Sequence, residues 1–364
     1  MNFYRDRFSA SGPDWVSMTV KEKNNVRSLV EILGKNYSSS IGIIIDIHKV
    51  MGLEINSSNL RIEGSIGSLV IKLLDAQDSA NFDSYALIYA HIKNLGLPGP
   101  HILGGDKGEL LGRPFIAMDY IPGHYFSGSK LDLSLVGSAI REFHQGFSDC
   151  KALTFPELPA LQSNSNHILT EFLTTNDEWD SKFGADLAFM LRQNIDLLID
   201  TEARCSASLS TLLSVDRANL HVDLHPHNII VGASQAIIID IDSLKNVAWP
   251  SALGFCFYKL ARQVIAVHGA EETDYSELKD FFKTIVSGYG ISEKRVSLCF
   301  LGGLTEILRR ILIILEGNLG AGVSPWNQVL AIQIQAISEI HFLYKRVFGY
   351  SINESDKGVM YENW

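Results

Sequence analysis

The residues best suited to chemistry lie between positions 221 and 242. Asp223 and Asn228 precede a short run of β-branched residues, and Asp240 follows a second such run after a four-residue break that contains Gly232. Two short apolar runs with a break of this kind predict a hairpin of buried strands. The hairpin would gather two carboxylates and an amide oxygen at its open end, and such oxygen donors suit a hard cation such as Mg²⁺.

Two histidines in the same stretch raise zinc as a second possibility. His221 and His225 are four residues apart and would share one face of a helix. However, Pro226 disfavours helix at this point, and no further Cys/His pair completes a tetrahedral set of ligands. A zinc hydrolase is therefore much less favoured than a magnesium site.

Lys72 is the unusual member of a strongly apolar run at 69–74. A lysine in such a strand either extends its ammonium group to the edge or meets an anion. Phosphoryl transfer needs a base for the acceptor hydroxyl, metal ligands, a cation on the phosphates and a loop that covers them. Asp223, the pair Asn228 and Asp240, Lys72 and the turn at 56–59 could supply these parts in that order.

The elements that must position these residues divide into a strand-rich and a helix-rich part. An amphipathic helix is predicted over 20–37 and is followed by strands at 41–50, 60–62 and 69–74, which form an antiparallel meander. A helix over 82–95 and strands at 102–103 and 114–118 complete the first part. Later helices are predicted at 131–146, within 166–213, and at 253–268, 275–289, 295–315 and 325–347. The predicted domains are an N-terminal extension with a helix (1–40), an N-lobe (41–121), a helical C-lobe (122–350) and a tail (351–364).

The composition narrows the class of protein. The 364 residues are enough for two lobes, and the net charge of −10 argues against general nucleic-acid binding, although it favours a cationic small substrate weakly. The four cysteines are scattered, as in a reducing compartment. The N-terminus lacks secretory-signal features, and Arg309 and Arg310 interrupt the most apolar late stretch. We expect a cytoplasmic protein with no nucleic-acid or membrane partner.

The pattern His221-x-Asp223-x-His225-Pro226-x-Asn228-Ile229-Ile230, followed by Ile239-Asp240, resembles the aminoglycoside phosphotransferase and choline kinase-like family. Weaker matches in the same order lie at 58–59, 70–72, 96–100, 115–123 and 140–144, so that the resemblance covers about 41 to 262. It implies an α+β protein with the two-lobed protein-kinase-like fold, which has a small antiparallel-sheet N-lobe and a larger, mostly helical C-lobe.

The resemblance also implies roles for individual residues. Asp223 would be the catalytic base, and Asn228 and Asp240 would hold Mg²⁺. Asp242 would assist the metal or, equally, cap the next segment, and His221 and His225 would be scaffold. The nucleotide, ATP or GTP, would be held by Lys72, Ser58, Asn59, Met118, Asp119 and Ile121. The implied activity is transfer of the γ-phosphate to a hydroxyl of a small molecule such as an aminoglycoside, an amino alcohol or a sugar.

One departure from the family opens an alternative function. The family usually has a Glu in the helix over 82–95 that pairs with the lysine, and this chain has none there. Tyr85 occupies the corresponding position, and Asp83 is the nearest acid. A nucleotide-binding pseudokinase or regulatory module is therefore the second hypothesis. A protein kinase is disfavoured, because the segment Asp240-Ile241-Asp242-Ser243 lacks the Gly that usually follows in protein kinases and no activation-loop end motif appears before the helix at 253.

The acceptor is not identified by these motifs. An acidic cluster could meet a cationic acceptor or could form a solvated helix face, and it consists of Glu171, Asp177, Glu178 and Asp180. Trp249, Trp326 and Tyr258 could hold a quaternary amine or could belong to the core or the rim. His144 is interpreted as a core or helix-end residue with one hydrogen bond rather than as a catalytic group.

Overall fold

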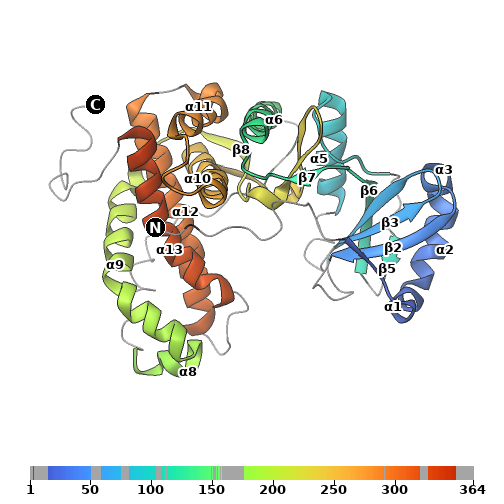
Figure 1. The fold of residues 1–364 in the computed structure, drawn as a ribbon, viewed down its shortest axis with the longest axis horizontal. Coiled ribbons are helices and arrows are strands. Elements are labelled where there is room, and N and C mark those ends of the chain that lie inside the picture. The colour runs from blue at the N-terminus through green and yellow to red at the C-terminus, as the bar shows by residue number, and fades with distance from the viewer. Residues whose placement is uncertain are drawn as a thin grey trace.

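The computed structural model describes residues 3, 15–50, 59–74, 82–103, 108–110, 113–148, 150, 153, 155, 157, 176–290, 292–319 and 327–349. Figure 1 shows two lobes, with the sheet of the N-lobe at one end and most of the long helices at the other. The predicted boundary at 121–122 falls between the last strand of the N-lobe sheet and the first short strand of the C-lobe. The tail at 351–364 lies outside the described residues.

The N-lobe is built on an antiparallel sheet of six strands in the order β1-β2-β3-β4-β6-β5. These strands are β1 (Trp15–Ser17), β2 (Ile44–Val50), β3 (Asn59–Gly64), β4 (Ser68–Leu73), β5 (Gly108–Leu110) and β6 (Arg113–Asp119). The predicted meander is confirmed, because β2 pairs antiparallel with β3 and β3 pairs antiparallel with β4. Alternate residues of β3 and β4 are buried, as expected for strands with one covered face. The predicted strand at 102–103 is reduced to one isolated bridge, Ile102 to Met118.

Helices pack against this sheet and link it to the C-lobe. The predicted helix over 20–37 is divided at Val26 into α1 (Val20–Asn25) and α2 (Arg27–Asn36), and α3 (Ser38–Ile41) follows. Thr19 begins α1 with a capping box, in which Thr19 and Glu22 exchange hydrogen bonds. The helix α5 (Phe82–Leu95) has the predicted bounds. Its buried residues Ile88, Tyr89 and Ile92 belong to the core of the C-lobe, so that α5 connects the two lobes.

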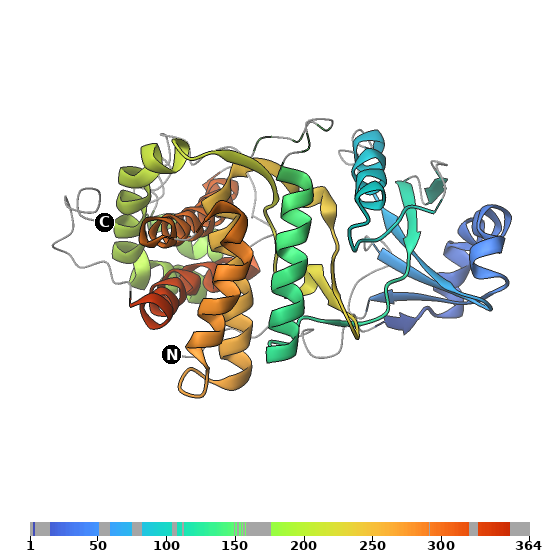
Figure 2. The same cartoon turned by 90° about the horizontal axis from the view of Figure 1, so that it is seen from above.

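The C-lobe combines helices with short strands that carry the polar residues of 221–242. The helices are α6 (Lys130–Ser148), α8 (Trp179–Phe183), α9 (Ala185–Leu213), α10 (Trp249–His268), α11 (Tyr275–Val286), α12 (Glu293–Leu319) and α13 (Asn327–Phe348). The strands are β7 (His124–Tyr125), β8 (Arg217–His221), β9 (Ile229–Val231), β10 (Ala236–Ile238) and β11 (Leu244–Ala248). Single 3-10 turns occur at 176–178, 226–228, 241–243 and 287–289. The larger core lies among these helices, and Figure 2 shows α6 between the N-lobe and the helices that follow α10.

The predicted hairpin is confirmed. Strands β9 and β10 pair antiparallel, with Ile230 opposite Ile237, and the turn closes through a hydrogen bond from the Gly232 N–H to the Gln235 carbonyl. Strands β8 and β11, which sequence reasoning did not predict, pair before and after this hairpin. Together the four strands bring both ends of the 221–242 stretch to one place.

Close contact between α10 and α12 depends on glycine. A Cβ on Gly254 would lie 1.9 Å from the Cys299 carbonyl oxygen, and a Cβ on Gly302 would lie 2.5 Å from the backbone of Pro250. Because no side chain separates the helices here, their backbones approach each other directly. This contact sets the position of the next two turns of α12, which include Arg309 and Arg310.

Candidate active site

His221 fixes the loop that presents Asp223. Its ring is fully buried, and its Nε2 lies 3.3 Å from the Ile239 carbonyl and 3.1 Å from the Asp240 carbonyl, so that it donates to this pair of acceptors. Its Nδ1 accepts the N–H of Asp223 at 3.2 Å. Behind it, the N–H of His221 donates to His144 Nε2 at 3.4 Å. His221 therefore joins the ends of β8 and β10, and His144 is a core residue with one hydrogen bond.

The other polar residues of the loop are held by the same short elements. Asn228 is buried, and its Nδ2 donates to the Asp223 carbonyl at 2.8 Å, which leaves its side-chain oxygen as an acceptor. The backbone of Asp240 has the left-handed helical conformation, with φ 60° and ψ 43°. In the described part of the chain, Asp240 is the one non-glycine residue with positive φ. Aspartate tolerates this conformation better than most residues, and it turns the chain sharply after β10.

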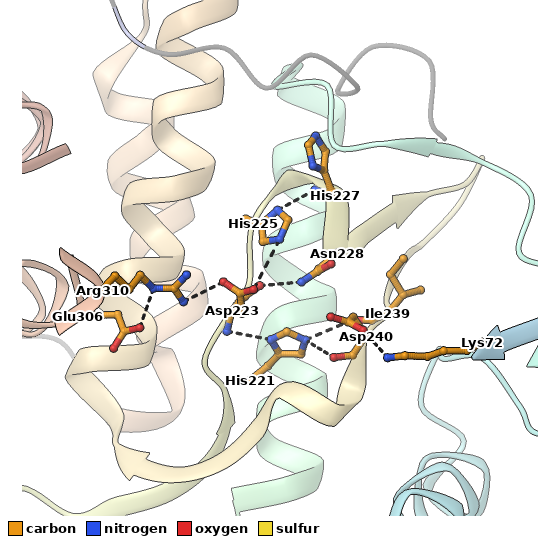
Figure 3. Close-up of polar contacts among 10 residues, drawn as sticks. All are labelled: Lys72, His221, Asp223, His225, His227, Asn228, Ile239, Asp240, Glu306 and Arg310. Carbon is orange, nitrogen blue, oxygen red and sulfur yellow. Dashed lines mark hydrogen bonds and ion pairs between the residues drawn. The ribbon is translucent and has the colours of Figure 1, made fainter. Parts of the chain in front are cut away.

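Lys72 reaches this loop from the N-lobe. Its Nζ donates to Asp240 Oδ1 and to Asp242 Oδ1, both at 2.7 Å, and its side chain is 12% exposed. Figure 3 shows Lys72 extending from its strand toward Asp240. Burial alone would lower the pKa of Lys72, but the charges of Asp240 and Asp242 outweigh it and raise that pKa. Lys72 is therefore charged and meets two carboxylates, which is one of the two alternatives predicted for a lysine in an apolar strand.

The pKa values of the two carboxylates beside Lys72 are shifted in opposite directions. Burial and the neighbouring charge of Asp242 raise the pKa of Asp240. For Asp242, burial would raise the pKa, but Lys72 outweighs burial and lowers it. Two carboxylates this close need a cation between them. Lys72 supplies that cation here.

The donor set at this point fits a magnesium ion. The oxygens of Asn228, Asp240 and Asp242 are hard donors, and two carboxylates with one amide match the chemistry that Mg²⁺ prefers. Zinc is not supported: His225 is extended (φ −144°, ψ 171°) at the start of a 3-10 turn. Within the described ranges, no three His, Cys, Asp or Glu residues come together as a metal site, so the magnesium donors are limited to two carboxylates and the Asn228 amide.

A cavity of about 460 Å³ lies beside Lys72, between the N-lobe sheet and the hairpin. The residues expected to hold the nucleotide that line it are Asn59, Lys72, Met118, Asp119 and Ile121, and Asn228, Asp240 and Asp242 line it as well. Asn59 is the cross-strand partner of Lys72 in β3 and β4. Ser58 and most of the predicted covering turn at 56–59 lie outside the described residues. The cavity thus brings together every described residue that was assigned to the nucleotide or the metal.

Asp223 is held at the other side of the loop. Its Oδ1 accepts from an Arg310 terminal nitrogen at 2.9 Å, and His225 Nε2 lies 3.8 Å from its Oδ2. Burial would raise the pKa of Asp223, but Arg310, His225 and His221 together outweigh it and lower that pKa to about 2. The carboxyl group is therefore ionised at neutral pH.

Sequence reasoning did not assign Arg310, Trp15 or Tyr89 to the site. Arg310 lies in an apolar stretch of α12. A charged residue in an apolar segment needs an anionic partner, and this is the signal that identified Lys72 and could have identified Arg310. Trp15 in β1 lines the cavity, although its segment was considered only as an extension. Tyr89 in α5 also lines the cavity, and its phenol interacts electrostatically with Lys72. The side chains of Asp83 and Tyr85 lie outside the described residues.

Asp180 and Glu178, two described members of the acidic cluster, lie away from this site. Asp180 pairs with Arg192 at 2.7 Å and Glu178 pairs with Lys182 at 3.0 Å, on elements at the end of the C-lobe distant from the N-lobe (Figure 1). Trp249 and Tyr258 are buried in the core. Glu171 and Trp326 lie outside the described residues. The described acidic residues therefore support the interpretation as a solvated helix face, and Trp249 and Tyr258 support the interpretation as core residues.

No helix in the described part of the chain is both long and apolar enough to cross a bilayer.

Comparisons with known proteins agree with this geometry. Similar solved structures include a spectinomycin phosphotransferase in complex with ADP and spectinomycin, with 17% identity, a TM-score of 0.61, and coverage of 86% of this chain and 94% of that one. An aminoglycoside phosphotransferase from Alicyclobacillus acidocaldarius has 12% identity, a TM-score of 0.56, and coverage of 86% and 95%. The choline kinase of Streptococcus pneumoniae has 14% identity, a TM-score of 0.51, and coverage of 86% and 99%. These likenesses confirm the two-lobed α+β fold.

A comparison with curated proteins gives no match. The model of the phosphotransferase enzyme family matches residues 49–246, which is more than half of the chain and includes Lys72 and the whole 221–242 stretch. The chain therefore belongs to the phosphotransferase enzyme family, a family of small-molecule kinases.

Proposed function

We propose that this protein transfers the γ-phosphate of ATP or GTP to a hydroxyl group of a small molecule. The observation that carries the proposal is the meeting of Lys72 from the N-lobe with Asp240 and Asp242 from the C-lobe, at 2.7 Å each, at the edge of the cavity. Phosphoryl transfer needs this combination of a lysine and metal-binding oxygens next to a base.

Asp223 acts as the base in this proposal. Its carboxylate orients the acceptor hydroxyl and accepts its proton as the oxygen forms a bond to the γ-phosphorus and the bond to the β–γ bridging oxygen breaks. With a pKa of about 2, Asp223 is a weak base, so its main contribution is to orient the hydroxyl, and it accepts the proton late.

The nucleotide would occupy the cavity between the lobes. The N–H of Asp119 donates to the His101 carbonyl, so Asp119 would offer its own carbonyl oxygen to the adenine, together with the backbone of Ile121. Lys72 and Asn59 would contact the phosphates, with Ser58 beside them. Asn228 and Asp240, with Asp242 close by, would hold Mg²⁺, which would neutralise charge on the phosphates when bound.

The acceptor is proposed at the level of its class. The structural relatives named above act on spectinomycin, other aminoglycosides or choline, and these alcohols form the first panel to test. The four free cysteines fit the reducing cytoplasm as the compartment.

The test measures phosphate transfer from Mg-ATP and Mg-GTP to each alcohol of the panel. We expect turnover with at least one acceptor and its loss in Asp223→Asn. Asp280→Asn, which changes an exposed aspartate on α11, is the matched control and should keep the wild-type rate. Turnover that persists in Asp223→Asn would refute the assignment of the base.

The alternative, a nucleotide-binding module without turnover, rests on the absence of Glu from α5. Nucleotide binding can be measured separately, because Trp15 lines the cavity and its fluorescence should change when nucleotide binds. Trp15→Phe identifies the part of the signal that comes from this residue. Binding with no transfer to water or to any acceptor would favour the alternative.

A further inference from the structure

Arg310 connects the buried part of α12 to the loop of Asp223. One terminal nitrogen donates to Asp223 Oδ1 at 2.9 Å, and its Nε donates to Glu306 Oε1 at 2.8 Å. Figure 3 shows the guanidinium between these two carboxylates, on the side of Asp223 opposite Lys72. The guanidinium group is therefore shared between a residue of the site and a residue of the helix core.

Arg310 is held firmly on its own helix. Glu306 is 3% exposed, and the face of the Phe255 ring lies 4.2 Å from the guanidinium carbon. Phe255 belongs to α10, whose close contact with α12 at Gly254 and Gly302 was described above. A planar guanidinium fixed by a carboxylate and an aromatic face loses little further freedom when it binds a second carboxylate.

Arg309 offers an internal comparison. Its Nε donates to Glu306 Oε2 at 2.8 Å and a terminal nitrogen donates to Glu306 Oε1 at 2.7 Å, so both of its described hydrogen bonds go to Glu306. The two neighbouring arginines thus share one buried carboxylate. Arg310, in addition, donates a hydrogen bond to Asp223.

We propose that Arg310 is the positioning residue of the phosphotransfer site: by binding Asp223 Oδ1 it directs Oδ2 toward the acceptor hydroxyl. The inference rests on the proposed role of Asp223 as base. The distance of 3.8 Å from His225 Nε2 to Oδ2 is too long for a hydrogen bond, which leaves Oδ2 for the acceptor. Arg310 is 87 positions from Asp223 along the chain, and through it α12 contributes to the site.

The kinetic test compares Arg310→Met with Arg309→Met. In both variants Glu306 keeps one arginine, so both should fold. We expect Arg310→Met to lower kcat by about 10²-fold, the typical cost of misplacing a reacting group by about 1 Å, while KM for Mg-ATP stays within about twofold. Arg309→Met should keep kcat near that of the wild type. Arg310→Lys should recover part of the rate, and added guanidinium ion should partly rescue Arg310→Ala.

The rates are measured with the responsive acceptor of the panel or, failing one, as phosphate release from Mg-ATP to water. Equal losses of kcat in the two Met variants, or a rise in KM with unchanged kcat, would overturn the inference. If Asp223→Asn abolishes transfer and Arg310→Met does not change it, the proposed function stands and the positioning role fails. If Asp223→Asn has the wild-type rate, the assignment of the base fails and the positioning role fails with it. If the wild type transfers phosphate neither to water nor to any acceptor, the proposed function itself fails.

Crystal structures of the same two variants test the positioning without any turnover. We expect the Asp223 carboxylate to leave its wild-type orientation in Arg310→Met and to keep it in Arg309→Met. An unchanged Asp223 in Arg310→Met would contradict the inference whatever the kinetics.

Discussion

His144 should make the stability of the C-lobe depend on pH. The residue is 1% exposed on α6, and its Nε2 accepts the N–H of His221. Burial, reinforced by His221, lowers the pKa of His144 from 6.5 to about 3. The neutral ring is therefore the form that fits the folded chain, and the unfolded chain binds the additional proton when the pH falls below 6.5.

The magnitude follows from linkage. The stabilisation is fully present above pH 6.5 and is lost as the pH falls toward 3, at about 1.4 kcal/mol for each pH unit. Between neutral pH and pH 5 the loss is therefore about 2 kcal/mol from His144 alone. This is a large share of the stability of an ordinary domain.

His144→Gln removes the titration and keeps a side-chain acceptor for the N–H of His221. Urea unfolding, followed by circular dichroism at pH 7.5 and pH 5, measures the free energy of unfolding of each variant. We expect the loss between these pH values to be about 2 kcal/mol smaller in His144→Gln than in the wild type. His268→Gln changes an exposed histidine that binds the Gly128 carbonyl and should keep the wild-type dependence. An equal loss in His144→Gln and the wild type would refute the reasoning.

Two further perturbations address the contact between the lobes and the contact between helices. Lys72→Met leaves Asp240 and Asp242 without their ammonium group and should lower the free energy of unfolding by about 1–3 kcal/mol. The loss is below that of a fully buried pair because the Asp240 side chain is 40% exposed. Millimolar Mg²⁺ should recover part of this lost stability in a thermal-shift assay, and no recovery would contradict the metal assignment. The control is Lys283→Met, which removes the lysine of an exposed ion pair with Asp280. Gly254→Ala would force α10 away from α12 and should cost about 3 kcal/mol or more. Gly232→Ala, whose Cβ would meet nothing nearer than 3.5 Å, should cost much less, and equal melting temperatures would refute the role of the glycine contact.

Local sequence patterns predicted the helices and strands that are specified by residues close together in the chain. The helix Phe82–Leu95 has its predicted bounds, and the end of α9 at Leu213 was expected as well. The hairpin of β9 and β10 followed from two β-branched runs and a turn that contains glycine. Such features depend on residues a few positions apart, so their periodicity can be read directly from the sequence.

The same stretch also predicted the chemistry of the site. The order of Asp223, Asn228 and Asp240 around a hairpin restricts them to one region, because the strands between them are short. Lys72 was recognisable because a charge inside an apolar strand needs an anion. The sequence by itself thus determined the family, the hairpin and the residue types of the site.

Tertiary structure decided which distant groups complete the site. The contact from Lys72 to Asp240 spans 168 positions and the contact from Arg310 to Asp223 spans 87, and no local pattern contains such pairings. The position of Arg310 depends on how closely α10 and α12 pack at their glycines, and the position of Trp15 depends on the pairing of β1 with β2. Which cation faces which carboxylate was therefore decided by the packing of whole elements, because electrostatic pairing acts over a few ångströms in space and is independent of separation along the chain.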